Sequence, residues 1–301
     1  MKKINKIEIQ NPLKTTKKIK KIIGVNSVKG GCGKTSISLS LALTAATKNE
    51  KVCFCDIDVL GTSSKYIVFG KDEKYKIKYI DFKKMEAKAD DFINEINFKD
   101  HITDIKLNAI FMNESAKYKR NHVKESNLNP MNEIIFIDKL ISYLEMIFEK
   151  FDVVILDFSP GIDKISSKIH NSIKEYCKKK DHIIYRNVLV ATPDYSSIVT
   201  MIDTLKEISS EYKITDNRII INNMLQHLIS TEFEKFEKDV FEEYKNEVGK
   251  TLINATYFKT FDCVKLFIKS FTFGKTNPIY GNDISELTNS YIYEWVIDKC
   301  V

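Results

Sequence analysis

The chain has 301 residues, of which 43% are hydrophobic, and this length is enough to bury the core of a large α/β domain. Its apolar runs are shorter than the roughly 18 residues of a transmembrane helix, and its first residues are polar and lysine-rich, so we expect neither a membrane span nor a secretory signal. Six cysteines without a CxxC pair exclude a zinc ribbon or a small disulfide framework and favour a reduced, cytoplasmic location.

The net charge of +6 is concentrated near the start of the sequence. Residues 1–21 carry eight lysines and one glutamate, a local charge of +7, so the other 280 residues sum to about −1. We therefore interpret residues 1–21 as a basic N-terminal extension and residues 22–301 as one domain, with a variable lysine-rich segment at about 71–130. Only three arginines occur, which limits the number of bidentate contacts to phosphates or bases.

Hydrophobic runs and helical periodicities alternate along the domain, which predicts an α/β fold with a mainly parallel β-sheet flanked by helices. The expected strands are Ile22 to Ser27, Val52 to Ile57, Ile105 to Phe111, Val153 to Phe158, Asn187 to Thr192, Arg218 to Asn222 and Thr251 to Ala255. The expected helices lie at about 34–49, 137–148, 164–178, 198–205 and 231–247, with two more near the C-terminus. In the last of these we expect Tyr291, Trp295 and Val296 to pack in the core.

A glycine-rich segment lies between the first strand and the first helix. Its sequence is KGGCGKTS, made up of Lys29, Gly30, Gly31, Cys32, Gly33, Lys34, Thr35 and Ser36. Glycines let the backbone wrap around phosphate oxygens, and the start of the helix adds its positive dipole end. Lys34 is placed to contact the β- and γ-phosphates, and the Thr35 hydroxyl to ligate Mg²⁺. The segment therefore predicts a site for ATP and Mg²⁺.

The start of this segment departs from an ordinary Walker A motif. Val28 stands where that motif has a glycine, and Lys29 begins the loop. The pattern resembles the deviant Walker A motif of the ParA/MinD family of P-loop ATPases. The resemblance implies ATP hydrolysis and a homodimer that ATP joins face to face. It also implies that Lys29 crosses the interface and contacts the partner's nucleotide, as an arginine finger does.

Two further acidic motifs match the same family. Asp56 and Asp58 lie at the end of the second strand, and Asp157 follows the hydrophobic run that begins at Val153. The resemblance implies that Asp58 positions the attacking water, while Asp56 and Asp157 support Mg²⁺ together with Thr35. Lys29, Lys34 and Asp58 are then the expected catalytic residues.

Asparagines and cysteines supply the remaining candidates. Asn222 follows the run Ile219 to Ile221 and matches the family's adenine-reading asparagine, with its neighbour Asn223 as the alternative. Cys53 and Cys55 alternate on one strand and face the same side, and we interpret them as small buried hydrophobic residues.

The partner of the expected switch has three candidates. A ParA-like DNA-partitioning ATPase, which binds nonspecific DNA as an ATP dimer, is favoured by the basic extension and by two further basic clusters, at Lys117, Lys119, Arg120 and Lys124 and at Lys265 and Lys269. A scaffold-positioning ATPase would act through protein partners. A MinD-like membrane switch is disfavoured, because the stretch 283–299 is acidic and not basic. An activating protein partner is expected in each case, and no membrane contact is expected.

Overall fold

The computed structural model of the protein describes residues 18–58, 63–69, 76–82, 88–99, 104–112, 130–161, 164–192, 196–197, 199–204, 217–222, 256–259 and 290–297. Eight strands form one sheet in the order β3-β4-β2-β5-β1-β6-β7-β8. Every neighbouring pair is parallel except β3 and β4, which are antiparallel. The predicted α/β fold is therefore confirmed.

The strands are β1 (Lys20–Ser27), β2 (Val52–Asp56), β3 (Asn94–Lys99), β4 (Asp104–Phe111), β5 (Val153–Pro160), β6 (Ile183–Ala191), β7 (Asn217–Ile221) and β8 (Thr256–Lys259). The helices are α1 (Lys34–Thr47), α2 (Ser63–Phe69), α4 (Pro130–Lys150), α5 (Lys164–Lys178) and α10 (Ser290–Ile297), with a 3₁₀ turn at Ala89–Asp91. The central strands β1, β2 and β5 are buried along almost their whole length, because helices cover both of their faces.

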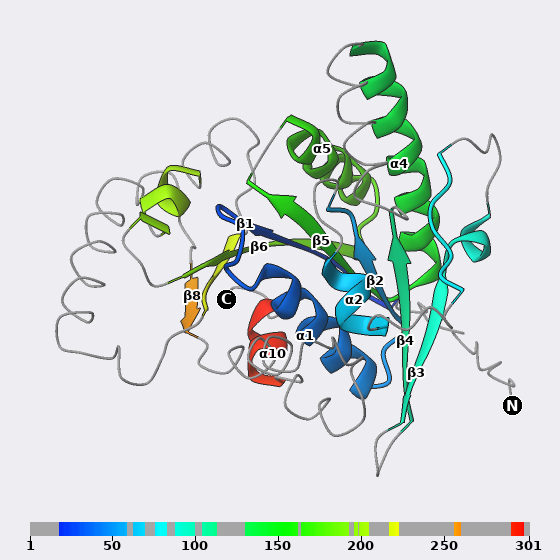
Figure 1. The fold of residues 1–301 in the computed structure, drawn as a ribbon, viewed down its shortest axis with the longest axis horizontal. Helices are drawn as coiled ribbons and strands as arrows, with labels where there is room; N and C mark the ends of the chain where they lie inside the picture. The colour runs from blue at the N-terminus through cyan, green and yellow to red at the C-terminus, as the bar shows by residue number, and fades with distance from the viewer. Residues whose placement is uncertain are drawn as a thin grey trace, which may run out of the picture.

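Two hydrophobic clusters lie on the two faces of the sheet, so the molecule has three layers (Figure 1). On one face α1 packs against the sheet, and α10 lies beside it, in contact with both α1 and β6, and adds Ile292, Tyr293 and Val296 to the core. A helix that is covered on two sides has to be apolar on most of its surface. Helix α1 meets this requirement with its Leu and Ala residues. On the other face lie α4 and α5, where Leu140, Leu144 and other apolar side chains meet the sheet.

The structure corrects the predicted N-terminal boundary. Lys20 and Lys21, which the charge count assigns to a free extension, are the first two residues of β1. Lys18 Nζ lies 2.8 Å from Asp152 Oδ2, and Lys21 Nζ lies 3.0 Å from Glu50 Oε2. Lys20 Nζ donates to the carbonyl oxygens of Phe148 and Glu149 at the end of α4. Residues 18–21 therefore belong to the domain.

The segment at 71–130 contains more structure than its sequence predicts. Beyond the expected strand β4, it holds the antiparallel strand β3 and the 3₁₀ turn. Ile80, Phe92 and Ile93 are core residues on the α4 side, and the Phe92 ring lies 5.4 Å from that of Tyr143 on α4. Helix α4 also begins at Pro130, well before the first predicted core position, Ile137.

Of the predictions for the C-terminal part, one is wrong, one is confirmed and others lie outside the described residues. Residue Tyr291 of α10 is 80% exposed, so its predicted place in the core is wrong, while Val296 is buried as predicted. The strand expected at 251–255 and the helix expected at 231–247 lie outside the described residues, and β8 begins just after the former, at Thr256. The two predicted basic clusters at 117–124 and 265–269 also lie outside them. Among the described helices, none has the length and apolarity needed to cross a bilayer.

Candidate functional site

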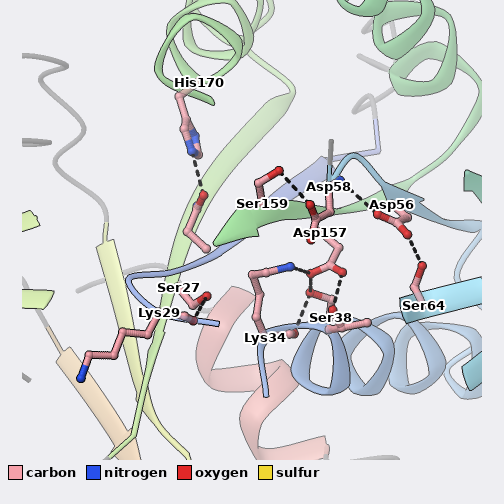
Figure 2. A network of polar contacts seen from close by, with 12 residues as sticks. Ser27, Lys29, Lys34, Ser38, Asp56, Asp58, Ser64, Asp157, Ser159 and His170 are labelled. Carbon is pink, nitrogen blue, oxygen red and sulfur yellow. Dashed lines mark hydrogen bonds and ion pairs between the residues drawn. The ribbon is translucent and has the colours of Figure 1, made fainter. Parts of the chain in front are cut away.

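The candidate site lies at the carboxyl ends of the adjacent strands β2, β5 and β1, the edge at which open α/β sheets bind ligands (Figure 2). In the parallel pair of β2 and β5, Asp56 is opposite Asp157. The loop between β1 and α1 rises beside them and supplies Lys34 and Thr35. The sheet order therefore brings together three sequence motifs that are separated by up to about 120 residues in the chain.

The glycine loop has backbone angles that residues with a side chain rarely adopt. Gly31 and Gly33 have φ angles of 83° and 84°, in the left-handed region that favours glycine. Gly33 caps the start of α1, and the first turn of this helix contains no acidic residue that would offset its positive dipole end. The loop thus presents a positive helix terminus at the edge of the sheet.

Asn222 braces this loop from the end of β7. Its amide Nδ2 donates to the carbonyl oxygen of Cys32 over 2.8 Å, and its side chain is fully buried. A Cβ atom on Gly33 would lie 2.1 Å from the same Nδ2. The structure thus places Asn222 against the phosphate-binding loop. Its role toward adenine stays a prediction, and Asn223 lies outside the described residues.

The Asp157 carboxylate accepts hydrogen bonds from three side chains in the first two turns of α1. Lys34 Nζ lies 2.7 Å from Oδ1 and Ser38 Oγ donates to the same oxygen over 2.9 Å, while Thr35 Oγ1 donates to Oδ2 over 2.8 Å. Lys34 and Asp157 have side chains that are 6% and 1% exposed, so this is a buried ion pair. Removing one partner from such a pair leaves an uncompensated charge in the interior.

The two carboxylates at the end of β2 and just after it, Asp56 and Asp58, are held in different ways. Asp56 Oδ1 accepts the backbone N–H of Asp58 over 3.0 Å, and its Oδ2 accepts the hydroxyl of Ser64 on α2. Asp58 Oδ1 accepts the hydroxyl of Ser159 over 2.9 Å. Both carboxylates are at least nine-tenths buried. The predicted Asp56, Asp58 and Asp157 therefore lie near one another beside the glycine loop, as a polar cluster with the hydroxyls that they accept (Figure 2).

Lys29 lies apart from this cluster. Its Nζ donates to the hydroxyl of Ser196 over 2.7 Å, and Figure 2 shows the side chain pointing away from Lys34 and Asp157. Ser27 Oγ donates to the Lys29 carbonyl oxygen, which holds the start of the loop. Ser36, the remaining predicted loop residue, is half-buried in the first turn of α1.

The donor set at Asp157 fits a magnesium ion. Thr35 Oγ1 and Asp157 Oδ2 are 2.8 Å apart, close to the spacing of about 2.9 Å between neighbouring ligands of an octahedral Mg²⁺. Asp56 adds a second carboxylate directly across the strand pair. Hydroxyl and carboxylate oxygens are the ligands that Mg²⁺ prefers, so the residues present suit this ion and not a thiolate-bound metal.

Three serines in this cluster were not predicted: Ser38, Ser64 and Ser159. Ser38 is four residues after Lys34 and so lies on the same face of α1. Ser159 is two residues after Asp157, near the end of β5. The spacing of Ser38 is visible in the sequence and would have identified this residue, whereas the contacts of Ser159 and of Ser64 on α2 follow only from the fold.

A second polar group is buried on the opposite face of the sheet. His170 Nε2 lies 3.2 Å from Asn26 Oδ1, its Nδ1 is hydrogen-bonded to the Tyr185 hydroxyl, and its ring stacks on Phe158. Asn26 Nδ2 in turn donates to Asn187 Oδ1 over 2.7 Å. Burial lowers the pKa of His170 to about 3, so the imidazole is neutral. This group joins α5 to the strand that leads into the glycine loop.

Cys53 and Cys55 face the same side of β2, as predicted, with their Sγ atoms 3.8 Å apart. Both are fully buried on the α4 side of the sheet. Within the part of the chain that the structure describes, no three histidine, cysteine or acidic side chains are grouped as a metal site would require. These cysteines are core residues.

A family model described as an AAA domain matches residues 20–173, just over half of the chain. The iron–sulfur cluster carrier protein of Haemophilus influenzae is 24% identical over 215 residues, which are 71% of this chain and 49% of that protein. The chain thus spans about half the length of this curated relative.

Two solved structures show the same fold. The ParA family ATPase from Chlorobium tepidum superposes with a TM-score of 0.58 at 16% identity, over 93% of this chain and 98% of that one. The apo McdA of Cyanothece superposes with a TM-score of 0.57 at 17% identity, over 88% of this chain and 93% of that one. With the matching family model and the loop that begins at Lys29, the chain belongs to the ParA/MinD family of P-loop ATPases.

Proposed function

We propose that this chain hydrolyses ATP with Mg²⁺ and works as a switch that dimerises when ATP is bound. One observation carries the proposal: a single buried carboxylate, Asp157, gathers the lysine and the two hydroxyls that follow the glycine loop. A lysine, a threonine hydroxyl and a carboxylate at the start of a helix supply the charge and the ligands that a triphosphate with Mg²⁺ requires.

Each residue has a role in the proposed reaction. The backbone of residues 30–36 holds the phosphates, and Lys34 contacts the β- and γ-phosphates. Thr35, Asp56 and Asp157 hold Mg²⁺, which when bound neutralises charge on the phosphate oxygens. Asp58 orients the attacking water. Lys29 reaches the nucleotide of a second copy of the chain, and to do so it has to leave Ser196.

Phosphate release by the purified chain with ATP and Mg²⁺ tests this proposal. We expect slow hydrolysis by the wild type and loss of hydrolysis in Lys34→Ala, because no other described side chain occupies the position of its ammonium group beside Asp157. Lys48→Ala is a matched control, since Lys48 pairs with Glu294 at the far end of the same helix. Hydrolysis by Lys34→Ala at the wild-type rate would show that the loop is not the catalytic site.

For the platform of the switch we propose nonspecific DNA, as in a ParA-like partitioning system. The lysines at positions 2, 3, 6, 14 and 17 support this proposal, because they precede the first strand, which begins at Lys20. The charge available is smaller than the sequence count, since Lys18 and Lys21 pair with Asp152 and Glu50 of the same domain. A protein scaffold with an activating partner is the alternative, and a membrane surface is the least supported.

Binding to random-sequence DNA at several salt concentrations separates these platforms. We expect binding that weakens as salt rises, more steeply for the ATP-bound dimer than with ADP, because a dimer engages more phosphates. No DNA binding by the ATP-bound dimer at low salt would favour the scaffold. The described cysteines do not support the cluster-carrying function of the Haemophilus relative, since Cys32, Cys53 and Cys55 are buried and the half-buried Cys177 belongs to no metal-type group of described residues.

A further inference from the structure

Ser159 is a buried hydroxyl at the centre of the site to which no role has yet been assigned. It is the seventh residue of β5, is 2% exposed, and donates from Oγ to Asp58 Oδ1 over 2.9 Å. Figure 2 shows this contact next to the Lys34–Asp157 pair. The hydrogen bond connects the segment after β2 with the end of β5.

The strand register explains why these two residues meet. β2 and β5 are paired so that Asp56 lies opposite Asp157, and the ladder continues past the end of β2 because Ile57 N donates to the Asp157 carbonyl oxygen over 3.0 Å. Two residues farther along each chain come Asp58 and Ser159. The same register therefore brings the Asp58 and Ser159 side chains within hydrogen-bond distance.

The contact restrains the Asp58 carboxylate. The backbone N–H of Asp58 is already fixed by Asp56 Oδ1, and the Ser159 hydroxyl holds one of the two carboxylate oxygens. A carboxylate held at one oxygen presents the other in a defined direction. Alignment of a catalytic group before the reaction lowers the entropic part of the barrier.

We propose that Ser159 is a positioning residue for ATP hydrolysis that acts through Asp58. This inference rests on the proposed ATPase function. In that reaction the water oxygen bonds to the γ-phosphorus, the bond to the β–γ bridging oxygen breaks, and ADP leaves with that electron pair, while the water protons end on phosphate and solvent. Ser159 takes no part in these bond changes, and it fixes the carboxylate that orients the water.

Three substitutions of Ser159 test the inference by steady-state ATP hydrolysis and nucleotide binding. Ser159→Ala removes the donor. We expect kcat to fall about tenfold, because the Asp58 carboxylate loses a hydrogen bond that helps it to align the water. KM and nucleotide affinity should stay unchanged, because Ser159 acts only on this alignment. Ser159→Thr keeps the hydroxyl and should restore kcat. Ser159→Cys keeps the size but donates weakly, and should be as slow as Ala.

Ser167→Ala is the matched control, since Ser167 is a buried serine of α5 whose Oγ has no hydrogen-bond partner among the described residues. We expect its kcat to equal that of the wild type. Wild-type kcat in Ser159→Ala, full activity in Ser159→Cys, or a loss of nucleotide affinity in place of kcat would each overturn the positioning role while leaving the ATPase proposal intact. A wild-type chain that binds ATP and does not hydrolyse it would overturn both.

Discussion

At the scale of single residues, the site depends on backbone angles that favour glycine and on buried carboxylates that accept hydrogen bonds from neighbouring side chains. The hydroxyls around Asp157 and Asp58 satisfy buried oxygens that would be costly to leave without a donor. The glycine loop depends in the same way on the space around it, and Gly33 is the position with the least room.

Gly33→Ala should lower both thermal stability and nucleotide affinity. Its φ of 84° is strained for alanine by roughly 1–2 kcal/mol, and the new Cβ would lie 2.1 Å from Asn222 Nδ2. Gly30→Ala is the comparison for thermal unfolding, since nothing lies within 4 Å of a Cβ there. Equal melting temperatures for the two variants would show that Asn222 does not confine the loop.

The buried His170 should make folding sensitive to acid. Its pKa is about 3 in the folded chain and about 6.5 when unfolded, so the unfolded state binds more protons between these values. The His170 contribution to the free energy of unfolding is therefore full above pH 6.5 and falls as the pH drops toward 3. Urea unfolding at several pH values should show this loss in the wild type and a weaker one in His170→Asn. Identical pH profiles would argue against a neutral buried imidazole.

At the scale of elements, the packing of α10 on α1 closes one face of the domain. Tyr293 is fully buried, and its hydroxyl donates to Glu50 Oε1 over 2.8 Å, the carboxylate that also pairs with Lys21 of β1. Burial raises the pKa of Tyr293 well above its usual value, so the side chain stays a neutral donor. Helix α10 thus connects the C-terminal part of the chain to the helix that carries Lys34 and Thr35.

Tyr293→Ala should destabilise the domain by about 3–4 kcal/mol, because it leaves a cavity and removes the donor to Glu50. Tyr291→Ala is a control on the same helix, since Tyr291 is 80% exposed and should change stability by less than about 0.5 kcal/mol. Chemical denaturation measures both. A small effect of Tyr293→Ala would mean that α10 contributes little to the core.

At the scale of the whole molecule, the proposed switch needs a second copy of the chain. Lys29 is the residue that would connect the copies, and in the single chain it is held by Ser196 on the segment after β6. A phosphate oxygen offers this lysine a charge-assisted hydrogen bond. Nucleotide binding would in this way favour the dimer.

Asp58→Ala should accumulate as a dimer when ATP is present, since it binds nucleotide but does not align water. Lys29→Ala should stay monomeric under the same conditions. Light scattering or analytical ultracentrifugation with ATP and with ADP measures both variants. A monomeric Asp58→Ala at saturating ATP, or a Lys29→Ala that dimerises and hydrolyses normally, would contradict a role for Lys29 across an interface.

The sequence by itself determined the fold class and the main residues of the candidate site. The strands around β1, β2 and β5 are continuous apolar runs because helices bury both of their faces, and such runs are readable without any tertiary information. The glycine loop was equally visible, because its chemistry depends on a local spacing of glycines, lysine and threonine. Ser38 was within reach by helical periodicity, since it lies four residues after Lys34.

Only the tertiary structure decided the features that depend on neighbours distant in the chain. β3 is a half-polar edge strand, and it forms because it pairs with β4. Tyr291 and Tyr293 of α10 differ in burial because only Tyr293 faces the core that α1 helps to form. Lys18 and Lys21 count as tail charges in the sequence, yet they pair with Asp152 and Glu50 because β1 lies beside β5. The hydrogen bond from Ser159 to Asp58 follows from the register of β2 and β5, because contacts between side chains of different strands depend on how the strands align.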